Sequence, residues 1–189
     1  MEINEIIDKL KKGNERFTSG TPERKPQDTS QRKLLVTGQS PFAVILGCAD
    51  SRVVPEFIFD TGLGEIFTVR VAGNVANVAS IASIEFAVSN LNVKLVLVLG
   101  HSNCGAVSAA VDGGDLGYNL NSLLTHITPA IEQTPGGSID EIIKKNAELN
   151  ADELVKRSAI IAEAVKSGKL KIVPTYYHLE SGEVEFLTD

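Results

Sequence analysis

The segment VKLVLVLGHSNC, residues 93–104, determines the fold class of this chain. Its centre, Leu95–Leu99, is an unbroken apolar run, which is typical of a strand buried on both faces. Both faces of a sheet are covered when helices alternate with parallel strands. His101 and Cys104 follow directly, so residues with metal-binding chemistry stand where this strand ends. The segment therefore predicts an α/β fold with chemistry at the carboxyl end of a central strand.

Similar patterns continue on both sides of this segment. Residues 42–46 and 66–71 are two further apolar runs, and residues 74–91 carry small and apolar side chains at helical spacing. Strands that alternate with helices predict a mostly parallel β-sheet flanked by helices on both faces. The closing segment KIVPTYYHLESGEVEFL, residues 171–187, predicts a C-terminal strand pair around a turn at Ser181 and Gly182.

The start of the chain predicts a helix followed by an arm. Apolar residues recur at helical spacing from Ile3 to Leu10, which indicates a helix over residues 3–18. Residues 19–33 are polar and predict an exposed N-terminal helical arm. Because this segment has little local core, we expect it to wrap a second copy of the chain. We find no linker and expect residues 1–189 to form a single domain, with residues 1–33 as its N-terminal helix and arm.

Further helices are expected in the second half of the chain. One begins after Cys104, another covers residues 119–132, and a longer stretch reaches from Ser138 to Lys166. Ser138 and Glu141 have the spacing of a capping box, which places a helix start at Ser138. Asn150 is a second candidate cap, so this stretch forms either one helix or two.

Composition disfavours several classes of protein. The formal net charge is -6, and an acidic domain lacks the lysines and arginines that bind a nucleic-acid backbone. A membrane-spanning helix needs about 18 consecutive apolar residues, and the chain has no such run. The charged start lacks the apolar centre of a secretory signal. With only two cysteines, a disulfide-stabilised secreted protein is not indicated, and we expect a cytoplasmic protein without nucleic-acid or membrane partners.

Two short motifs carry the chemistry. Cys48-Ala49-Asp50-Ser51-Arg52 follows the first predicted strand, and His101-Ser102-Asn103-Cys104 follows the strand at residues 95–99. Ligand sites of open α/β sheets lie beyond the carboxyl ends of the strands. The two motifs meet there if their strands are neighbours, with the strand at residues 66–71 on the far side of the first. Cys48, Asp50, His101 and Cys104 are then candidate zinc ligands.

Arg52 distinguishes a catalytic from a structural zinc site. A structural zinc keeps four protein ligands, whereas a catalytic zinc leaves one position for water. Arg52 stands two residues after Asp50, so both side chains point to the same side of an extended segment. Its guanidinium can bind the Asp50 carboxylate through two hydrogen bonds and so keep it from the metal. Two thiolates neutralise Zn²⁺, and we expect a higher working pH than for a three-histidine site.

The sequence resembles the β-class carbonic anhydrases. The resemblance is carried by CADSRVVPE at residues 48–56, GEIFTVRVAGN at 64–74 and GHSNCGAV at 100–107, in the family's order. It implies zinc-dependent, reversible hydration of carbon dioxide to bicarbonate and a proton by attack of zinc-bound hydroxide. It also implies a Rossmann-like, mostly parallel β-sheet flanked by helices, and a homodimer or a higher homo-oligomer.

The resemblance also implies roles for particular residues. The family's zinc ligands match Cys48, His101 and Cys104, and its catalytic pair matches Asp50 and Arg52, with Asp50 as an alternative fourth ligand in a closed state. Three further positions match substrate contacts of the family. Gln39 matches a residue that reaches across the dimer in plant-type members, Phe67 matches an apolar wall of the substrate pocket, and Gly105 follows the last ligand with its backbone N–H near the substrate.

Two other functions remain open at the level of sequence. The same centre could act on carbonyl sulfide or carbon disulfide, which are linear electrophiles of similar shape. The chain could also be a non-catalytic zinc or nucleotide-binding module, although a structural site does not need Arg52. No proton shuttle is assigned, because His126 and His178 lie outside any ligand spacing.

Overall fold

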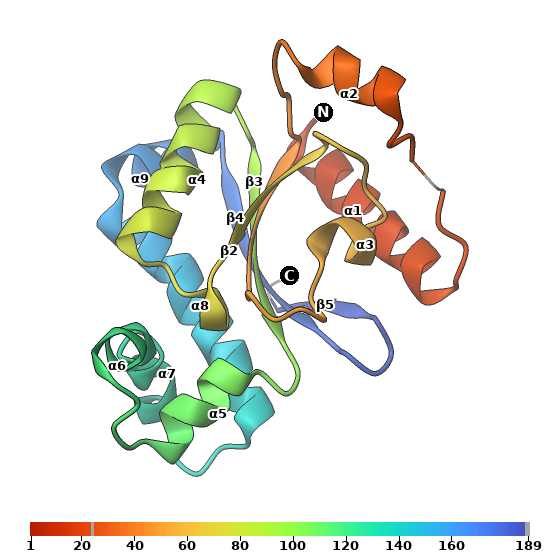
Figure 1. The fold of residues 1–189 in the computed structure, drawn as a ribbon. Coiled ribbons are helices and arrows are strands. Elements are labelled where there is room, and N and C mark those ends of the chain that lie inside the picture. Colours follow the sequence, from red (N-terminus) through yellow and green to blue (C-terminus); the bar gives the residue numbers. More distant parts are fainter. Residues whose placement is uncertain (24, 188–189) are drawn as a thin grey trace.

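The computed structural model describes residues 1–23 and 25–187. Within these residues, five strands form one sheet in the order β2-β1-β3-β4-β5 (Figure 1). The pairs β1/β2, β1/β3 and β3/β4 are parallel, whereas β4 and β5 are antiparallel. The strands are β1 Ala43–Gly47, β2 Ile66–Arg70, β3 Leu95–His101, β4 Lys171–Tyr177 and β5 Val184–Phe186. The predicted parallel sheet and C-terminal strand pair are thus confirmed.

Helices cover both faces of this sheet (Figure 1). On one face lie α1 and α3, and on the other lie α4, α8 and α9. The helical segments are α1 Ile3–Thr18, α2 Thr29–Leu35, α3 Pro55–Ile58, the short 3₁₀ helix η1 Ala72–Asn74, α4 Val78–Leu91, α5 Gly105–Asp112, α6 Tyr118–Leu124, α7 Thr128–Glu132, α8 Ile139–Arg157 and α9 Ala159–Lys166.

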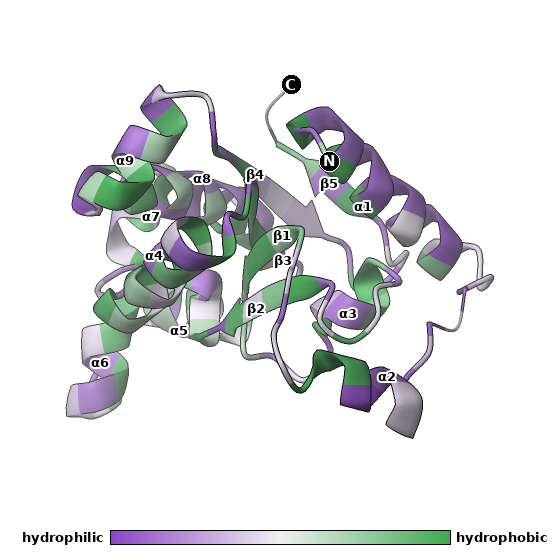
Figure 2. Cartoon of the chain, turned by 90° about the horizontal axis from the view of Figure 1, so that it is seen from above, coloured by the Kyte–Doolittle hydropathy of each residue, from purple (hydrophilic) through white to green (hydrophobic). Residues whose placement is uncertain are grey.

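The alternation of side chains along the central strands explains the two covered faces. In β1, Val44 and Leu46 pack with α4, α8 and α9, whereas Ala43 and Ile45 pack with α1. Successive side chains of a strand point to opposite faces, so an unbroken apolar run fills two cores at once. Figure 2 shows β1 and β3 as hydrophobic strands inside the molecule and a largely hydrophilic outer side on α1.

The register of the sheet brings the two motifs together. Gly47 of β1 lies opposite Leu99 of β3, and β2 lies on the far side of β1. The segments that follow β1 and β3 therefore leave the sheet at the same edge. This is the strand order on which the predicted metal site depends.

Two helix boundaries differ from the prediction. The long stretch is two helices, but the break is at Ser158, whose hydroxyl accepts a hydrogen bond from Ile161 N–H. Asn150 is not a cap, because it is buried within α8. Residues 119–132 form α6 and α7 rather than one helix, and Pro129 in the first turn of α7 lacks the N–H that a continuous helix requires.

The N-terminal segment packs differently from the expectation. Ile6 and Leu10 of α1 are buried against the sheet of their own chain, so the apolar face of α1 is not left for a second copy. The end of the predicted arm begins α2, which has no buried residue among those described. Leu34 of α2 is 74% exposed, and Val36, directly after this helix, is 80% exposed. Residue 24 of the arm and residues 188–189 of the expected single domain lie outside the described residues.

Candidate metal centre

Three buried side chains converge at the carboxyl edge of β1 and β3. Cys48 follows β1, His101 is the last residue of β3, and Cys104 caps the start of α5. Asn103 in the connecting turn has φ 54°, a left-handed conformation that Asn tolerates well. Among the described residues, these three form a group whose ligand atoms all lie within 4.8 Å of one another.

The histidine ring is oriented to offer a lone pair. Nδ1 of His101 lies 2.9 Å from the Ser102 carbonyl oxygen, which only accepts, so Nδ1 carries the hydrogen. Nε2 is then unprotonated in the neutral ring. It is buried and has no hydrogen-bond partner among the described residues. Because an unpaired buried polar atom is costly, this geometry fits a metal ligand.

The two cysteines are free and buried, and each affects the ionisation of the other. A hydrogen bond from Cys104 lowers the pKa of Cys48, and the interaction with Cys48 together with burial raises the pKa of Cys104. A divalent cation favours the ionised form of both, because thiolates bind metals and thiols do not. Two sulfurs and one imidazole nitrogen are a donor set that suits Zn²⁺.

The Asp50 carboxylate is held beside this cluster by Arg52. Arg52 Nε lies 2.9 Å from Oδ1 and Nη2 lies 2.7 Å from Oδ2, and the Arg52 backbone N–H also donates to Oδ1 at 2.9 Å. The hydrogen bonds from the Arg52 side chain are the main reason that the pKa of Asp50 lies well below its usual value. Asp50 Oδ2 is 3.9 Å from His101 Nε2. An ionised carboxylate therefore stands next to the cluster, bound through both oxygens to a guanidinium.

Two further groups hold the loop that carries Cys48 and Asp50. Arg70, at the end of β2, donates from Nε to the Cys48 carbonyl at 2.9 Å and from Nη2 to the Asp50 carbonyl at 2.6 Å. The Gly73 N–H points at Cys48 Sγ, with nitrogen and sulfur 3.4 Å apart. The loop is thus fixed at its backbone and at its sulfur.

Comparison with known proteins shows the family. Residues 43–184 match the family model described as carbonic anhydrase. The chain is 42% identical over 180 residues to carbonic anhydrase 2 of Mycobacterium tuberculosis, covering 92% of this chain and 87% of that protein. It is 41% identical over 184 residues to a carbonic anhydrase of Mycolicibacterium smegmatis, covering 93% and 89%.

Solved structures agree. A β-carbonic anhydrase of Aspergillus fumigatus superposes with a TM-score of 0.72 at 31% identity, covering 97% of this chain and 89% of that one. A Coccomyxa β-carbonic anhydrase in complex with acetazolamide gives 0.77 at 23% identity, covering 100% and 87%. The chain belongs to the β-class carbonic anhydrases. It is a zinc-dependent lyase that reversibly hydrates carbon dioxide to bicarbonate and a proton.

The other residues matched to β-class carbonic anhydrases lie apart from this cluster or at its border. Gln39 is exposed in the loop before the amino end of β1, whereas Cys48 follows the carboxyl end. Phe67 packs on the α4 side of β2, where its ring centroid lies 6.5 Å from that of Phe86. Gly105 follows Cys104 at the start of α5, and a Cβ there would meet no atom within 4 Å. Only Gly105 adjoins the cluster within one chain.

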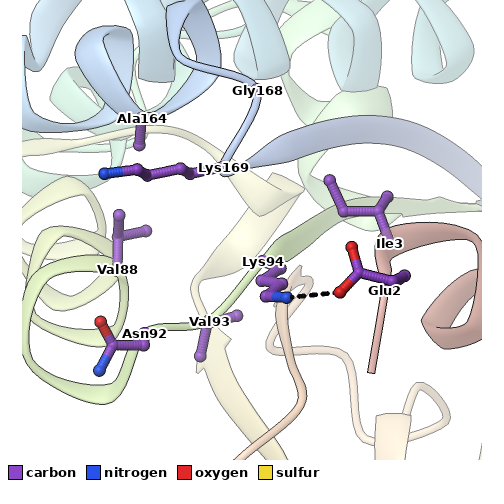
Figure 3. Close-up of a pocket in the computed structure, with 9 residues that line it drawn as sticks. All are labelled: Glu2, Ile3, Val88, Asn92, Val93, Lys94, Ala164, Gly168 and Lys169. Carbon is purple, nitrogen blue, oxygen red and sulfur yellow. Dashed lines mark hydrogen bonds and ion pairs between the residues drawn. The ribbon is translucent and has the colours of Figure 1, made fainter.

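A separate cavity of this carbonic anhydrase lies at the opposite end of the sheet. It has a volume of about 360 Å³ and is lined by residues that precede β3 and β4, including Lys94 and Lys169 (Figure 3). Lys94 Nζ is 3.1 Å from a carboxylate oxygen of Glu2. The lysines stand near the C-terminal ends of α4 and α9, where positive charge is favourable. The cavity is therefore no part of the zinc chemistry.

Three residues that contribute to this β-class centre are missing from the sequence predictions. Arg70 stands within the quoted segment GEIFTVRVAGN, one residue before Val71 at the end of the strand, and that position is its only signal. Gly73 stands in the same segment. Asn146 of α8 has no sequence signal, because only the folded chain places it against Gly73.

Proposed function

We propose that Cys48, His101 and Cys104 are the zinc ligands of this carbonic anhydrase, and that Asp50 and Arg52 are its catalytic pair. The observation that carries this proposal is the convergence of the three ligand atoms within 4.8 Å, with one imidazole nitrogen unpaired. Three protein ligands leave one position of a tetrahedron for solvent, which a catalytic zinc requires.

Zinc supplies the Lewis acidity that makes water a nucleophile near neutral pH. The residues of the chain orient the reacting water. Asp50 is ionised, and its Oδ2, which accepts only from Arg52 Nη2, keeps a lone pair that can accept a hydrogen bond from the reacting water, whereas Oδ1 already accepts two hydrogen bonds from Arg52. That bond orients an oxygen lone pair of the water toward carbon dioxide. The guanidinium of Arg52 fixes the position of the Asp50 carboxylate and keeps this carboxylate from the metal.

A closed state follows from the same pair. Asp50, if released from Arg52, would be the alternative fourth ligand of the zinc and would exclude solvent. The distance of 3.9 Å between Asp50 Oδ2 and His101 Nε2 makes this movement short. A crystal structure of the zinc protein at low pH tests the closed state, which is refuted if Asp50 remains on Arg52 while activity is lost.

Substrate binding is proposed to involve Gln39, Phe67 and Gly105. Gln39 would contribute from the partner subunit of a homodimer, because within one chain it lies before the opposite end of β1. Gly105 leaves open space beside Cys104. Phe67 would border the pocket from β2. A Gln39→Ala protein is expected to raise KM more than it lowers kcat.

The chain is proposed to work as a homodimer or higher oligomer in the cytoplasm. The Sordaria macrospora β-carbonic anhydrase that superposes with a TM-score of 0.77 is described as tetrameric. Cys48 and Cys104 form no disulfide, and disulfides are rare in cytosolic proteins, which supports a cytoplasmic location. No helix within the described residues has the length and apolar character needed to cross a membrane. Cell fractionation with an epitope-tagged chain tests the location.

Stopped-flow hydration of carbon dioxide by protein of measured zinc content tests the ligand assignment. Cys48→Ser is expected to lose most bound zinc and, with it, activity, because a hydroxyl is a far weaker zinc ligand than a thiolate. Ser51→Ala, in the same loop, is the matched control and should keep both. A Cys48→Ser protein with full zinc and full activity would remove Cys48 from the proposed centre.

A further inference from the structure

Buried hydrogen bonds connect α8 to the metal centre. Asn146 is 1% exposed, and its Nδ2 donates to the Gly73 carbonyl at 2.9 Å. The N–H of the same glycine points at Cys48 Sγ, at 3.4 Å. One residue therefore receives a hydrogen bond from α8 and gives one to a sulfur of the cluster.

The orientation of the Asn146 amide is fixed by its neighbour on the helix. Asn150 Nδ2 lies 2.9 Å from Asn146 Oδ1, so that oxygen accepts and the Asn146 nitrogen must face Gly73. Asn150 Oδ1 in turn accepts from the Ala76 N–H at 2.6 Å. Two asparagines one helical turn apart thus hold the loop after β2 at Gly73 and at Ala76.

The backbone of Gly73 suits this role. Its φ is 68°, and a Cβ there would lie 2.9 Å from Ile127 Cδ1 and 3.5 Å from Ala106 Cβ. A side chain would therefore be strained as well as crowded, so the position requires glycine. Because Ile127, directly before α7, and Asn146 of α8 both lie against this glycine, its N–H has little freedom to turn away from Cys48.

We propose that Asn146 is a positioning residue of the zinc centre, acting through the Gly73 N–H on the sulfur of Cys48. A hydrogen bond to a ligating sulfur withdraws electron density from it and fixes its lone-pair direction, and such outer contacts tune metal sites. Asn146 thereby sets how strongly Cys48 donates charge to the metal. This inference depends on the proposed role of Cys48 as a zinc ligand.

The alternative is that Asn146 and Asn150 only stabilise the fold. Buried amides need partners, and an asparagine pair between a helix and a loop supplies them without any effect on a metal. A purely structural role predicts lower stability with an unchanged metal spectrum. The proposal predicts a change at the sulfur itself.

Cobalt(II)-substituted protein separates the two roles, because its thiolate-to-metal charge-transfer band reports electron density on sulfur. In Asn146→Leu, which keeps similar volume but has no donor, we expect the band to move to longer wavelength. The zinc dissociation constant, measured by competition with a chelator, should rise about tenfold or more. An unchanged band and affinity in this variant would overturn the proposal.

Ser158→Ala is the matched control. Ser158 is also a buried polar residue, 2% exposed, and it bonds Glu85 and Ile161 at the far end of α8. Its loss should lower the stability of the fold and leave the cobalt band in place. If Ser158→Ala moves the band as much as Asn146→Leu does, the effect is general loosening and the proposal fails.

A second variant applies if Asn146→Leu does not fold. Asn150→Ala keeps Asn146 but removes the contact that orients it, so a smaller shift of the cobalt band is expected, and its absence overturns the proposal. The wild-type spectrum is a check on the proposed function. A wild-type cobalt protein without any thiolate band would refute the ligand role of Cys48, whereas a normal wild-type band with unchanged variants would refute the role of Asn146 alone.

Discussion

Arg52 determines what the carboxylate of Asp50 can do. The Arg52 side chain is 54% exposed, yet its guanidinium binds both oxygens of Asp50 and reaches the Asn103 carbonyl at 3.3 Å. An exposed ion pair contributes little to stability. We therefore interpret the two-point contact between Arg52 and Asp50 as a means of orienting the carboxylate at the metal centre.

Replacing Arg52 tests this at the level of one side chain. Arg52→Ala should keep zinc and lower kcat about a hundredfold. Without Arg52 the carboxylate of Asp50 loses its orientation, and loss of an oriented proton-accepting group typically has that effect. Arg52→Lys should restore little, because an ammonium group lacks the planar fork that binds both oxygens. Stopped-flow rates at measured zinc content check this. Zinc retained with unimpaired hydration in Arg52→Ala would exclude Arg52 from catalysis.

At the scale of elements, one buried ion pair connects α1 to the end of α3. Arg16 Nε lies 2.5 Å from Asp60 Oδ2, and the side chain of Asp60 is only 6% exposed. Burial is the largest single influence and acts to raise the pKa of Asp60, but the hydrogen bonds from Arg16 and the Glu23 N–H, together with nearby positive charge, lower the net pKa. The N-terminal helix is therefore attached to the core by charge as well as by Ile6 and Leu10.

This pair gives a pH dependence of stability with a definite sign. A carboxyl group whose pKa is lowered on folding stabilises the protein above its unfolded pKa, about 3.9 for Asp, and that stabilisation is lost as the pH falls below it. Asp60→Asn should lower the free energy of unfolding by about 1–3 kcal/mol at pH 7 and less at pH 3. Asn tolerates the φ of 45° found at this position. Urea unfolding at both pH values checks the difference, and an equal loss at both would contradict it.

For the molecule as a whole, α2 is the element with the least support from its own chain. It has no buried residue among those described, and Leu34 and Val36 are exposed. Exposed apolar side chains that cluster on one element often mark a contact with another chain. Because α2 directly precedes the loop with Gln39, assembly and the proposed substrate contact would depend on the same segment.

Sedimentation equilibrium tests the assembly. We expect at least a dimer, and Leu34→Glu should weaken it by about tenfold or more in dissociation constant, since a charge would replace a buried apolar contact. Tyr118→Glu, at a residue 87% exposed on α6, is the control and should leave the mass unchanged. A fully active monomer would refute both the assembly and the role of Gln39 across it.

Several helices and strands of this protein could be predicted from its sequence, because they depend on interactions between neighbouring residues. The strand at Leu95–His101, the helix at Ile3–Thr18 and the capping box at Ser138 follow from periodicity and local hydrogen bonds, which act over a few residues. The two ligand motifs were also predictable, because each follows an apolar strand and metal-binding residue types are few. The spacing of Asp50 and Arg52 gave their pairing in the same way.

Other features of this protein depend on contacts between distant segments, and they become visible only in the folded chain. The burial of α1 on its own sheet, the break at Ser158 rather than Asn150, and the support of the metal centre by Asn146 involve residues far apart in the chain. Such contacts depend on which faces of the assembled sheet are available to each helix. A pattern of a few neighbouring residues does not contain this information. An asparagine on a helix has the same local pattern whether it faces solvent or holds the glycine that donates a hydrogen bond to Cys48.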